Sequence, residues 1–224
     1  MNKTVVSIKN LYFKNIFHNF SLNIPADMNF AIVGENGMGK TTLIKILCNL
    51  LSKDSGTITF SNNIKHHHAN SDISYCAQHS SLPPNIKVKN ILQLFARIHH
   101  ITWEHVMTHS LFHNLRIDTI LNVKSQHLSG GQNRRLILFL TLFYNPRIVF
   151  LDEPFNDIDD RKNMIAILKT YCLLNHIQII LISHSVYEIK QLTQAGIFLS
   201  ANKKNIKIYS SKQLNNLLIK TFKN

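Results

Sequence analysis

Hydrophobic and polar residues follow two different spacings along this chain, and together they predict an α/β fold. Apolar and polar residues alternate over 4–8 and 20–24, as in half-exposed strands, and we expect these two strands to form an antiparallel layer. Short apolar runs within 147–154 and 178–183, I-V-F-L and I-I-L-I, predict strands covered on both faces. Such strands are typical of a mainly parallel sheet.

A helical stretch interrupts these strands in the middle of the chain. A short apolar strand at 73–77 is followed, from 88 to about 122, by mostly helical spacing. Because this stretch lies between one strand and the next, we expect an inserted helical subdomain at 79–145, with the α/β core formed by 1–78 and 146–224. We expect one face of the helical stretch to carry Leu92, Phe95 and Ile98.

The strongest local pattern lies between residues 30 and 47, where an apolar strand, a glycine-rich turn and an amphipathic helix follow one another. It fits G-x-x-x-x-G-K-[ST], in which backbone N–H groups at a helix start surround phosphate oxygens. We expect Lys40 to reach the β- and γ-phosphates of ATP and the Thr41 hydroxyl to bind Mg²⁺. The residues expected to bind nucleotide here are Gly34, Glu35, Asn36, Gly37, Met38, Gly39, Lys40, Thr41 and Thr42.

Two later strands end in side chains able to act on this phosphate. Asp152 and Glu153 follow one apolar run, and His184 follows the other. Ligands of open α/β sheets bind beyond the carboxyl ends of the strands, so we expect these residues beside the glycine-rich turn. Asp152 is expected to hold Mg²⁺, Glu153 to polarise the attacking water, and His184 to donate to a γ-phosphate oxygen.

A Ser-Gly-Gly segment, within L-S-G-G-Q at 128–132, leads into a helix expected near Asn133 and is a second possible anion-binding turn. It has the same anion-binding chemistry as the first turn, although Ser-Gly-Gly also forms ordinary turns.

Composition narrows the class of protein. A chain of 224 residues suits one α/β domain with an insertion. No apolar run approaches the roughly 18 to 20 residues of a membrane helix, and the strand-like pattern after Lys3 does not resemble a signal peptide. We therefore expect no transmembrane segment of its own. The net charge of +13 is spread without a dense basic run, so no direct nucleic-acid partner is expected.

Other residues that could bind a metal or nucleotide are expected to be structural, or their role is left undecided. Cys48, Cys76 and Cys172 show no C-x-x-C spacing and are expected as buried reduced thiols. Three adjacent histidines at 66–68 cannot all face one metal from an ordered strand or helix, so no metal site is expected there. An aromatic ring near the first strands would stack on adenine or fill the core instead, and the candidates are Tyr12, Phe13 and Phe17.

The order of these motifs along the chain resembles that of the ATP-binding cassette (ABC) family, and the resemblance extends over nearly the whole chain. The match is specific because L-S-G-G-Q is that family's signature. The resemblance implies a P-loop NTPase core with Mg²⁺ and ATP as cofactors. It identifies Gln78 as the Q-loop glutamine, which contacts the metal and takes part in catalysis, and His184 as the switch histidine. Asp159 corresponds to the aspartate of the loop after the V-F-L-D-E-P strand.

In this family two cassettes pack head to tail, which implies a second cassette as partner, either an identical copy or a close homologue. ATP held by Lys40 of one copy would be closed over by the signature of the other. Hydrolysis with Glu153 as base would then reopen the pair. The signature residues implied in nucleotide binding are Ser129, Gly130, Gly131 and Gln132.

The resemblance favours the ATPase subunit of a transporter with separate membrane-spanning subunits, located at the cytoplasmic face of the inner membrane. The segment starting at 85 resembles exporter-type cassettes, and D-E-P-F is similar to the haem-exporter ATPases of cytochrome c maturation. A soluble cassette ATPase of the iron–sulfur cluster assembly type also fits the length. The third alternative is a degenerate regulatory module, against which the intact Lys40, Asp152, Glu153 and His184 argue.

One departure from the family pattern concerns the loop after Glu153. Many members have P-T-S-G-L-D there, whereas this chain has P-F-N-D-I-D, which replaces the glycine with Asp157. The segment at 195–197 also lacks an acidic residue often found in the family. Neither change removes a group needed for phosphoryl transfer, so an active ATPase is expected.

Overall fold

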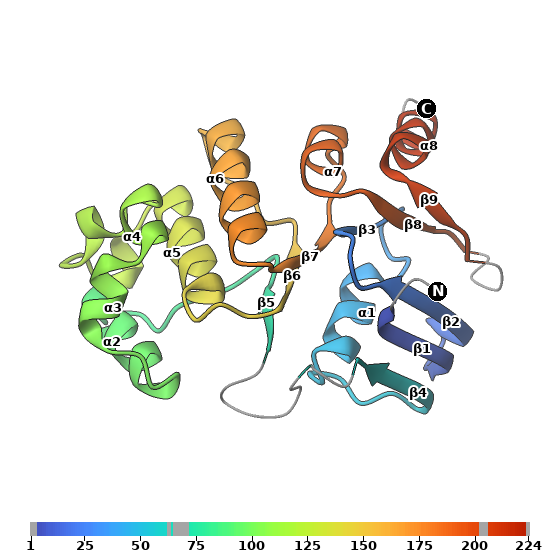
Figure 1. The fold of residues 1–224 in the computed structure, drawn as a ribbon, viewed down its shortest axis with the longest axis horizontal. Helices are drawn as coiled ribbons and strands as arrows, with labels where there is room; N and C mark the ends of the chain where they lie inside the picture. The colour runs from blue at the N-terminus through green and yellow to red at the C-terminus, as the bar shows by residue number, and fades with distance from the viewer. Residues whose placement is uncertain (1–3, 62–63, 65–71, 202–205, 223–224) are drawn as a thin grey trace.

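The computed structural model describes residues 4–61, 64, 72–201 and 206–222, and its strands form two sheets (Figure 1). The histidines at 66–68 lie outside the described residues. The strands are β1 (Thr4–Phe13), β2 (Phe17–Pro25), β3 (Phe30–Gly34), β4 (Ser55–Phe60), β5 (Ile73–Cys76), β6 (Ile148–Asp152), β7 (Gln178–Ile182), β8 (Ala195–Leu199) and β9 (Ile208–Ser210). The α-helices are α1 (Lys40–Leu47), α2 (Val88–Ile98), α3 (Trp103–Thr108), α4 (Ser110–Asn114), α5 (Gly130–Leu142), α6 (Arg161–Leu174), α7 (Val186–Leu192) and α8 (Ser211–Phe222).

The larger sheet has the strand order β5-β6-β7-β3-β8-β9, and its strands run parallel except for β9, which is antiparallel to β8. The smaller sheet is antiparallel, with β1 between β2 and β4. Every residue of β3, β6 and β7 is buried, as the uninterrupted apolar runs predicted. The predicted parallel sheet and antiparallel layer are therefore confirmed.

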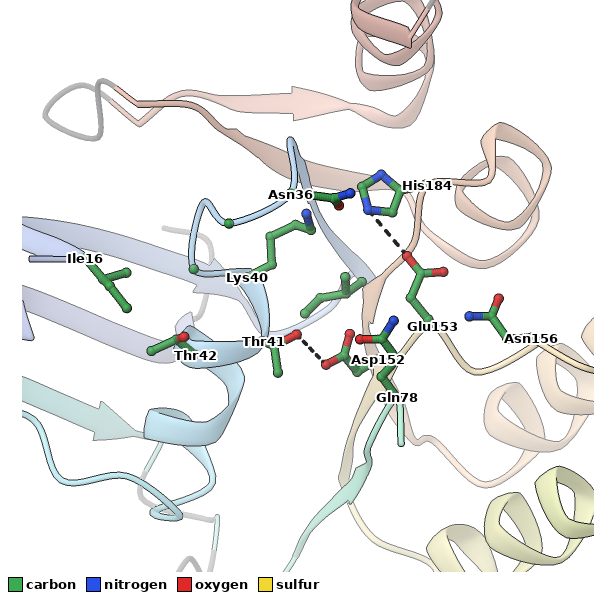
Figure 2. A pocket seen from close by; sticks show the side chains of 13 residues that line it. Ile16, Asn36, Lys40, Thr41, Thr42, Gln78, Asp152, Glu153, Asn156 and His184 are labelled. Atoms are coloured by element: carbon green, nitrogen blue, oxygen red, sulfur yellow. Dashed lines mark hydrogen bonds and ion pairs between the residues drawn. The ribbon is translucent and has the colours of Figure 1, made fainter. Parts of the chain in front are cut away.

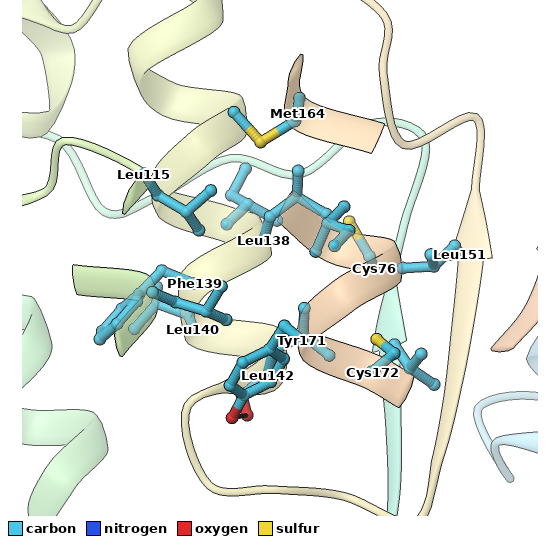
Figure 3. Packing of buried hydrophobic residues seen from close by; sticks show 14 of the residues in the cluster. Cys76, Leu115, Leu138, Phe139, Leu140, Leu142, Leu151, Met164, Tyr171 and Cys172 are labelled. Carbon is cyan, nitrogen blue, oxygen red and sulfur yellow. Dashed lines mark hydrogen bonds between the residues drawn. The ribbon is translucent and has the colours of Figure 1, made fainter. Parts of the chain in front are cut away.

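Both faces of the parallel sheet are covered, and successive residues of each strand pack on opposite sides. Phe30 and Phe150 pack with α1 and the antiparallel sheet, whereas Ala31 and Leu151 pack with α5, α6, α7 and α8. Figure 3 shows this second layer, where α5 and α6 pack together over β5 and β6. A strand with both faces covered needs apolar residues at every position, which explains why these strands show no alternation.

The middle of the chain is helical as expected, but its buried face differs from the prediction. On α2 the buried residues are Val88, Ile91, Leu92 and Ala96, whereas Ile98 is 44% exposed. At about 100° per residue, Ile98 lies roughly 240° around the helix from Leu92, so the two cannot share a face.

Helix α5 begins at Gly130, earlier than the predicted start near Asn133. The Ser129 Oγ atom accepts a hydrogen bond from the Gln132 backbone N–H at 3.2 Å, and the Gln132 side-chain oxygen accepts from the Ser129 N–H at 3.0 Å. This capping box uses two N–H groups that would otherwise lack partners, so the helix starts at the signature itself.

Cys76 and Cys172 are buried free thiols on β5 and α6 (Figure 3). Cys48 is a half-buried free thiol after α1. Burial raises the pKa of Cys48 to about 12, so this thiol stays protonated at neutral pH. None of the helices in the described part of the chain has the length and apolar character needed to span a membrane.

Candidate functional site

A polar pocket opens where β3, β6 and β7 end, at the carboxyl edge of the parallel sheet (Figure 2). Residues far apart in the sequence meet there because parallel strands end at the same edge. The lining residues are Ile16, Asn36, Gly37, Gly39, Lys40, Thr41, Thr42, Gln78, Asp152, Glu153, Asn156, Ile182 and His184. Most of the residues predicted from the glycine-rich turn and the strand ends are among them.

The loop between β3 and α1 folds around the Lys40 side chain. Lys40 Nζ donates to the carbonyl oxygens of Gly34 and Glu35, each at 2.8 Å. Gly39 has φ 92°, and a Cβ there would lie 2.5 Å from Ile16, so this position needs glycine for both reasons. Burial lowers the pKa of Lys40, and the nearby Glu153 and Asp152 oppose that effect.

Two predicted loop residues with side chains, Glu35 and Met38, do not line the pocket. Glu35 is exposed, and Met38 packs against the core below α1. Their backbone groups remain part of the loop, as the Glu35 carbonyl bonded to Lys40 illustrates.

Asp152 lies at the end of β6 with 1% of its surface exposed. Its Oδ2 atom accepts hydrogen bonds from Thr41 Oγ1 at 2.7 Å and from the Tyr75 hydroxyl at 3.3 Å. Gln78 projects beside Asp152 in Figure 2. A hydroxyl, a carboxylate and an amide oxygen are the hard ligands that Mg²⁺ prefers, so these residues fit a magnesium ion.

Glu153 has a left-handed backbone with φ 47°, which is uncommon outside glycine. Its Oε1 atom lies 3.7 Å from His184 Nε2, an ion-pair distance that is too long for a hydrogen bond. Burial, followed by the nearby Glu188 and Asp152, raises the pKa of Glu153 to about 7. Burial and Lys40 lower the pKa of His184. Near neutral pH this carboxyl group is therefore poised to take up a proton.

A buried network behind His184 was not predicted from the sequence. The Glu188 side chain is fully buried, accepts from Ser183 Oγ at 2.6 Å and pairs with Arg161 Nε at 3.0 Å. Ser183 immediately precedes His184, and Arg161 begins α6 just after Asp159. The network thus connects the segments that carry these two residues. The S-V-Y-E sequence at 185–188 carried a signal, because it has the capping-box pattern.

The signature residues and Asp159 lie outside the lining of this pocket. Gly130 and Gly131 instead face the loop after β6. A Cβ on Gly131 would lie 3.0 Å from the Asp157 carbonyl oxygen, so a side chain there would push the two segments apart. Asp157 has a left-handed backbone at φ 64°, a conformation that aspartate tolerates better than most residues.

The aromatic candidates for adenine stacking divide into two groups. Phe13 and Phe17 are 4% and 0% exposed and pack in the core, so neither presents an open ring face. Tyr12 is 40% exposed and lies edge-on to His18, with ring centroids 6.4 Å apart. The residue of this region that lines the pocket is Ile16, an aliphatic side chain that a search for aromatics passes over.

A parallel sheet whose edge combines a phosphate loop, an aspartate–threonine pair and a glutamate–histidine pair defines a P-loop ATPase domain. The chain belongs to the ABC transporter family, whose sequence profile matches residues 17–156. It is therefore an ATP-binding and ATP-hydrolysing cassette of that family.

The chain is also similar to individual proteins of known name, and it covers very different fractions of their lengths. The chain is 34% identical over 214 residues to the cytochrome c biogenesis ATP-binding export protein CcmA of Reclinomonas americana, covering 92% of this chain and 91% of CcmA. It is 31% identical to the glucosylceramide transporter ABCA12 of Mus musculus, covering 78% of this chain but 7% of ABCA12. A solved ATP-binding subunit of an ABC transporter shares the fold, with a TM-score of 0.79 at 16% identity over 96% of this chain and 93% of that one.

Proposed function

We propose that this chain is the ATP-hydrolysing subunit of a transporter whose membrane-spanning subunits are separate chains. The observation that supports this most is the convergence of Lys40, Thr41, Asp152, Glu153 and His184 in one pocket. Phosphoryl transfer needs a phosphate cradle, a metal site and a group that orients water, and this set supplies each of them.

In this proposal the backbone N–H groups of residues 34–42 surround the phosphates, and Lys40 leaves its two carbonyl acceptors for the β- and γ-phosphates. Thr41, Asp152 and Gln78 would hold Mg²⁺, which would supply positive charge to neutralise the phosphates. Glu153 orients the attacking water and accepts its proton, and His184 donates to a γ-phosphate oxygen. Tyr75 and the strand end keep the Asp152 carboxylate oriented toward Thr41.

We propose that a second cassette, identical or closely homologous, completes the site. Ser129, Gly130, Gly131 and Gln132 would close over ATP held by the partner's loop, and Asp159 would face the partner. The separation of these residues from the pocket of their own chain supports a head-to-tail pair. The two cassettes would close when ATP binds and reopen after hydrolysis, and this movement would drive the transporter.

Membrane-spanning subunits are the partners that would receive this movement, at the cytoplasmic face of the cell membrane. We propose that residues 79–145 act as the helical subdomain that meets them, with 1–78 and 146–224 as the core. No direct contact with nucleic acid is part of this proposal.

For the cargo, we propose export in cytochrome c maturation, with haem as the first substrate to test. The similarity to CcmA, which extends over most of both chains, supports this choice. The alternative is a soluble ATPase of the iron–sulfur cluster assembly type. Isolation from membranes with an associated membrane protein supports the transporter, whereas recovery only with soluble cluster-assembly proteins contradicts it.

The hydrolytic role is tested by Glu153→Gln, which keeps the size of the side chain but removes the base. We expect ATP turnover to fall by about 10²- to 10⁴-fold while ATP binding persists and an ATP-bound dimer accumulates. Glu104→Gln, at an exposed position on α3, is the matched control and should hydrolyse ATP normally. Unchanged turnover in the Glu153 variant would remove this residue as the base.

A further inference from the structure

Arg134 lies on α5, five residues after Ser129, and its side chain is buried although it carries a positive charge. The residue is only 5% exposed. Among the described residues, no carboxylate lies within ion-pair distance of its guanidinium. The buried Glu188 carboxylate interacts with Arg134 electrostatically without contacting it. A buried charge that lacks a direct ion pair is costly unless its donors are satisfied, so its hydrogen-bond partners indicate what the residue is for.

All of its hydrogen bonds go to backbone carbonyls at the ends of two strands. At the end of β6, Nε donates to Pro154 O at 2.7 Å, and Nη2 donates to Asp152 O at 3.1 Å and to Glu153 O at 2.7 Å. After β5, Nη1 donates to Ala77 O at 2.7 Å and to Gln78 O at 3.5 Å. One planar guanidinium thus holds the three consecutive carbonyls of residues 152–154 and the two carbonyls of Ala77 and Gln78.

We propose that Arg134 is a positioning residue for ATP hydrolysis, fixing Glu153 and Gln78 relative to one another and to the signature helix. This inference rests on the proposed roles of Glu153 and Gln78. Glu153 has a left-handed backbone, and the carbonyls before, at and after it all accept from Arg134. The guanidinium therefore holds the turn that aims the Glu153 carboxylate at the pocket.

The Arg134 side chain also connects the signature helix directly to the strand ends at the pocket. Arg134 and Ser129 belong to one capped helix, so a movement of the signature moves the guanidinium with it. Both strand ends would then shift together, because their carbonyls share one rigid donor group. A nucleotide that engages the signature would in this way adjust Glu153 and Gln78 without touching them.

Lysine does not replace this geometry, because its ammonium has three donors at one point and lacks the planar fork of arginine. The test compares Arg134→Lys and Arg134→Met with wild type. Arg147→Lys is the matched control, since Arg147 is a surface arginine with 56% of its side chain exposed, 3.7 Å from Asp72. ATP hydrolysis is measured at saturating and limiting ATP, and amide hydrogen exchange is measured without nucleotide.

We expect Arg134→Lys to lower kcat by on the order of 10²-fold, because a displacement of about 1 Å in a catalytic group has an effect of that size. KM should stay within about threefold, since the phosphate loop is untouched. Exchange should rise at residues 78–80 and 153–157, while the Arg147 variant resembles wild type in both measurements. If Arg134→Met does not fold, Arg134→Lys carries the test, since it keeps the charge and most of the volume.

A second arm asks whether the effect passes through Glu153. In the Glu153→Gln background, Arg134→Lys should lower turnover by clearly less than 10²-fold, because Glu153 no longer contributes and only the effect on Gln78 remains. A full additional loss would overturn the proposed path, as would wild-type kcat in Arg134→Lys or faster exchange without a change in kcat. If the wild-type protein does not hydrolyse ATP, the proposed function fails instead. The exchange measurement then still decides whether Arg134 holds the two strand ends.

Discussion

At the scale of single residues, burial changes the chemistry of several ionisable groups more than their neighbours do. Burial is the largest influence on the pKa of Lys40, Glu153 and His184 within the pocket. The same holds for His109, which is 8% exposed at the start of α4, far along the chain from the pocket residues. Because it lies apart from them, His109 provides a clean test of this effect.

His109 is held as a neutral imidazole by its hydrogen bonds. Its Nδ1 atom accepts from the Leu111 backbone N–H at 3.2 Å, and its Nε2 atom lies 3.0 Å from the Tyr171 hydroxyl, which in turn donates to Asn145. Protonation would place a hydrogen on Nδ1 facing another N–H. Burial and the nearby His105 lower the pKa of His109 from 6.5 to about 4.

We therefore predict that His109 makes the protein less stable as the pH falls from 6.5 to about 4. In that range the unfolded chain binds a proton that the folded state excludes, so the free energy of unfolding decreases with falling pH. His109→Asn keeps a capping side chain and should flatten this dependence in urea unfolding at several pH values. His176→Asn, at an exposed position with φ 53°, is the control and should leave the dependence intact.

At the scale of elements, close backbone approaches determine how strands and helices pack around the sheet. Gly196 lies on β8, paired with Ala31 of β3 and covered by α8. A Cβ at this position would lie 2.2 Å from the Ala31 carbonyl oxygen and 2.8 Å from Leu214 Cδ1. The first of these contacts is with backbone, so a rotamer change does not relieve it.

Gly196→Ala should consequently lower the free energy of unfolding by about 2 to 4 kcal/mol, because β3 and β8 must separate and α8 must shift. Gly37→Ala is a useful comparison for stability, since Gly37 has φ 78° but nothing within 4 Å of an added Cβ. It should cost only about 1 kcal/mol of backbone strain. Equal losses in chemical denaturation would show that steric contact at Gly196 is unimportant.

At the scale of the whole molecule, the pocket and the signature occupy different places, and this arrangement favours a site shared between two copies. The pocket is lined by loop, strand-end and His184 residues, whereas Ser129 and Gln132 cap α5 outside it. Relatives of the chain are named for different cargoes, glucosylceramide in one case and zinc in another, so the shared cassette does not specify the cargo.

Mixing two inactive variants tests the shared site directly. Lys40→Met removes the phosphate lysine, and Ser129→Arg blocks the signature at an exposed position. Each homodimer should be inactive, but a mixed dimer contains one site with both an intact loop and an intact signature. In an equal mixture about half of the dimers are mixed, so we predict that mixing restores up to about a quarter of the turnover per site that wild type shows, measured as ATP hydrolysis across mixing ratios. If each chain forms its site alone, mixing restores nothing.

The local chemistry of the site could be predicted from the sequence because it depends on short segments. The phosphate loop, the two carboxylates and His184 each follow an apolar strand, and parallel strands bring such positions to one edge. The roles given to these residues stay predictions. The buried face of α2 was predicted wrongly at Ile98 because helical rotation was not followed along the helix.

Other features were beyond the reach of sequence patterns because they join segments that are distant along the chain. No pattern distinguishes Arg134 from its neighbour Arg135, yet Arg134 alone bonds the ends of both β5 and β6. Likewise, Glu188 meets Arg161 only after α6 and α7 have packed on the sheet.

The sequence by itself determined the buried parallel strands, the antiparallel layer, the phosphate loop and the family, because periodicity and local backbone chemistry act over a few residues. The tertiary structure alone decided that Ile16 lines the pocket while Phe13 and Phe17 fill the core. It also decided that Arg134 links the signature helix to Glu153. Both outcomes depend on which surfaces meet when the two sheets and the helices pack. These contacts join segments distant in the sequence, so no local pattern predicts them.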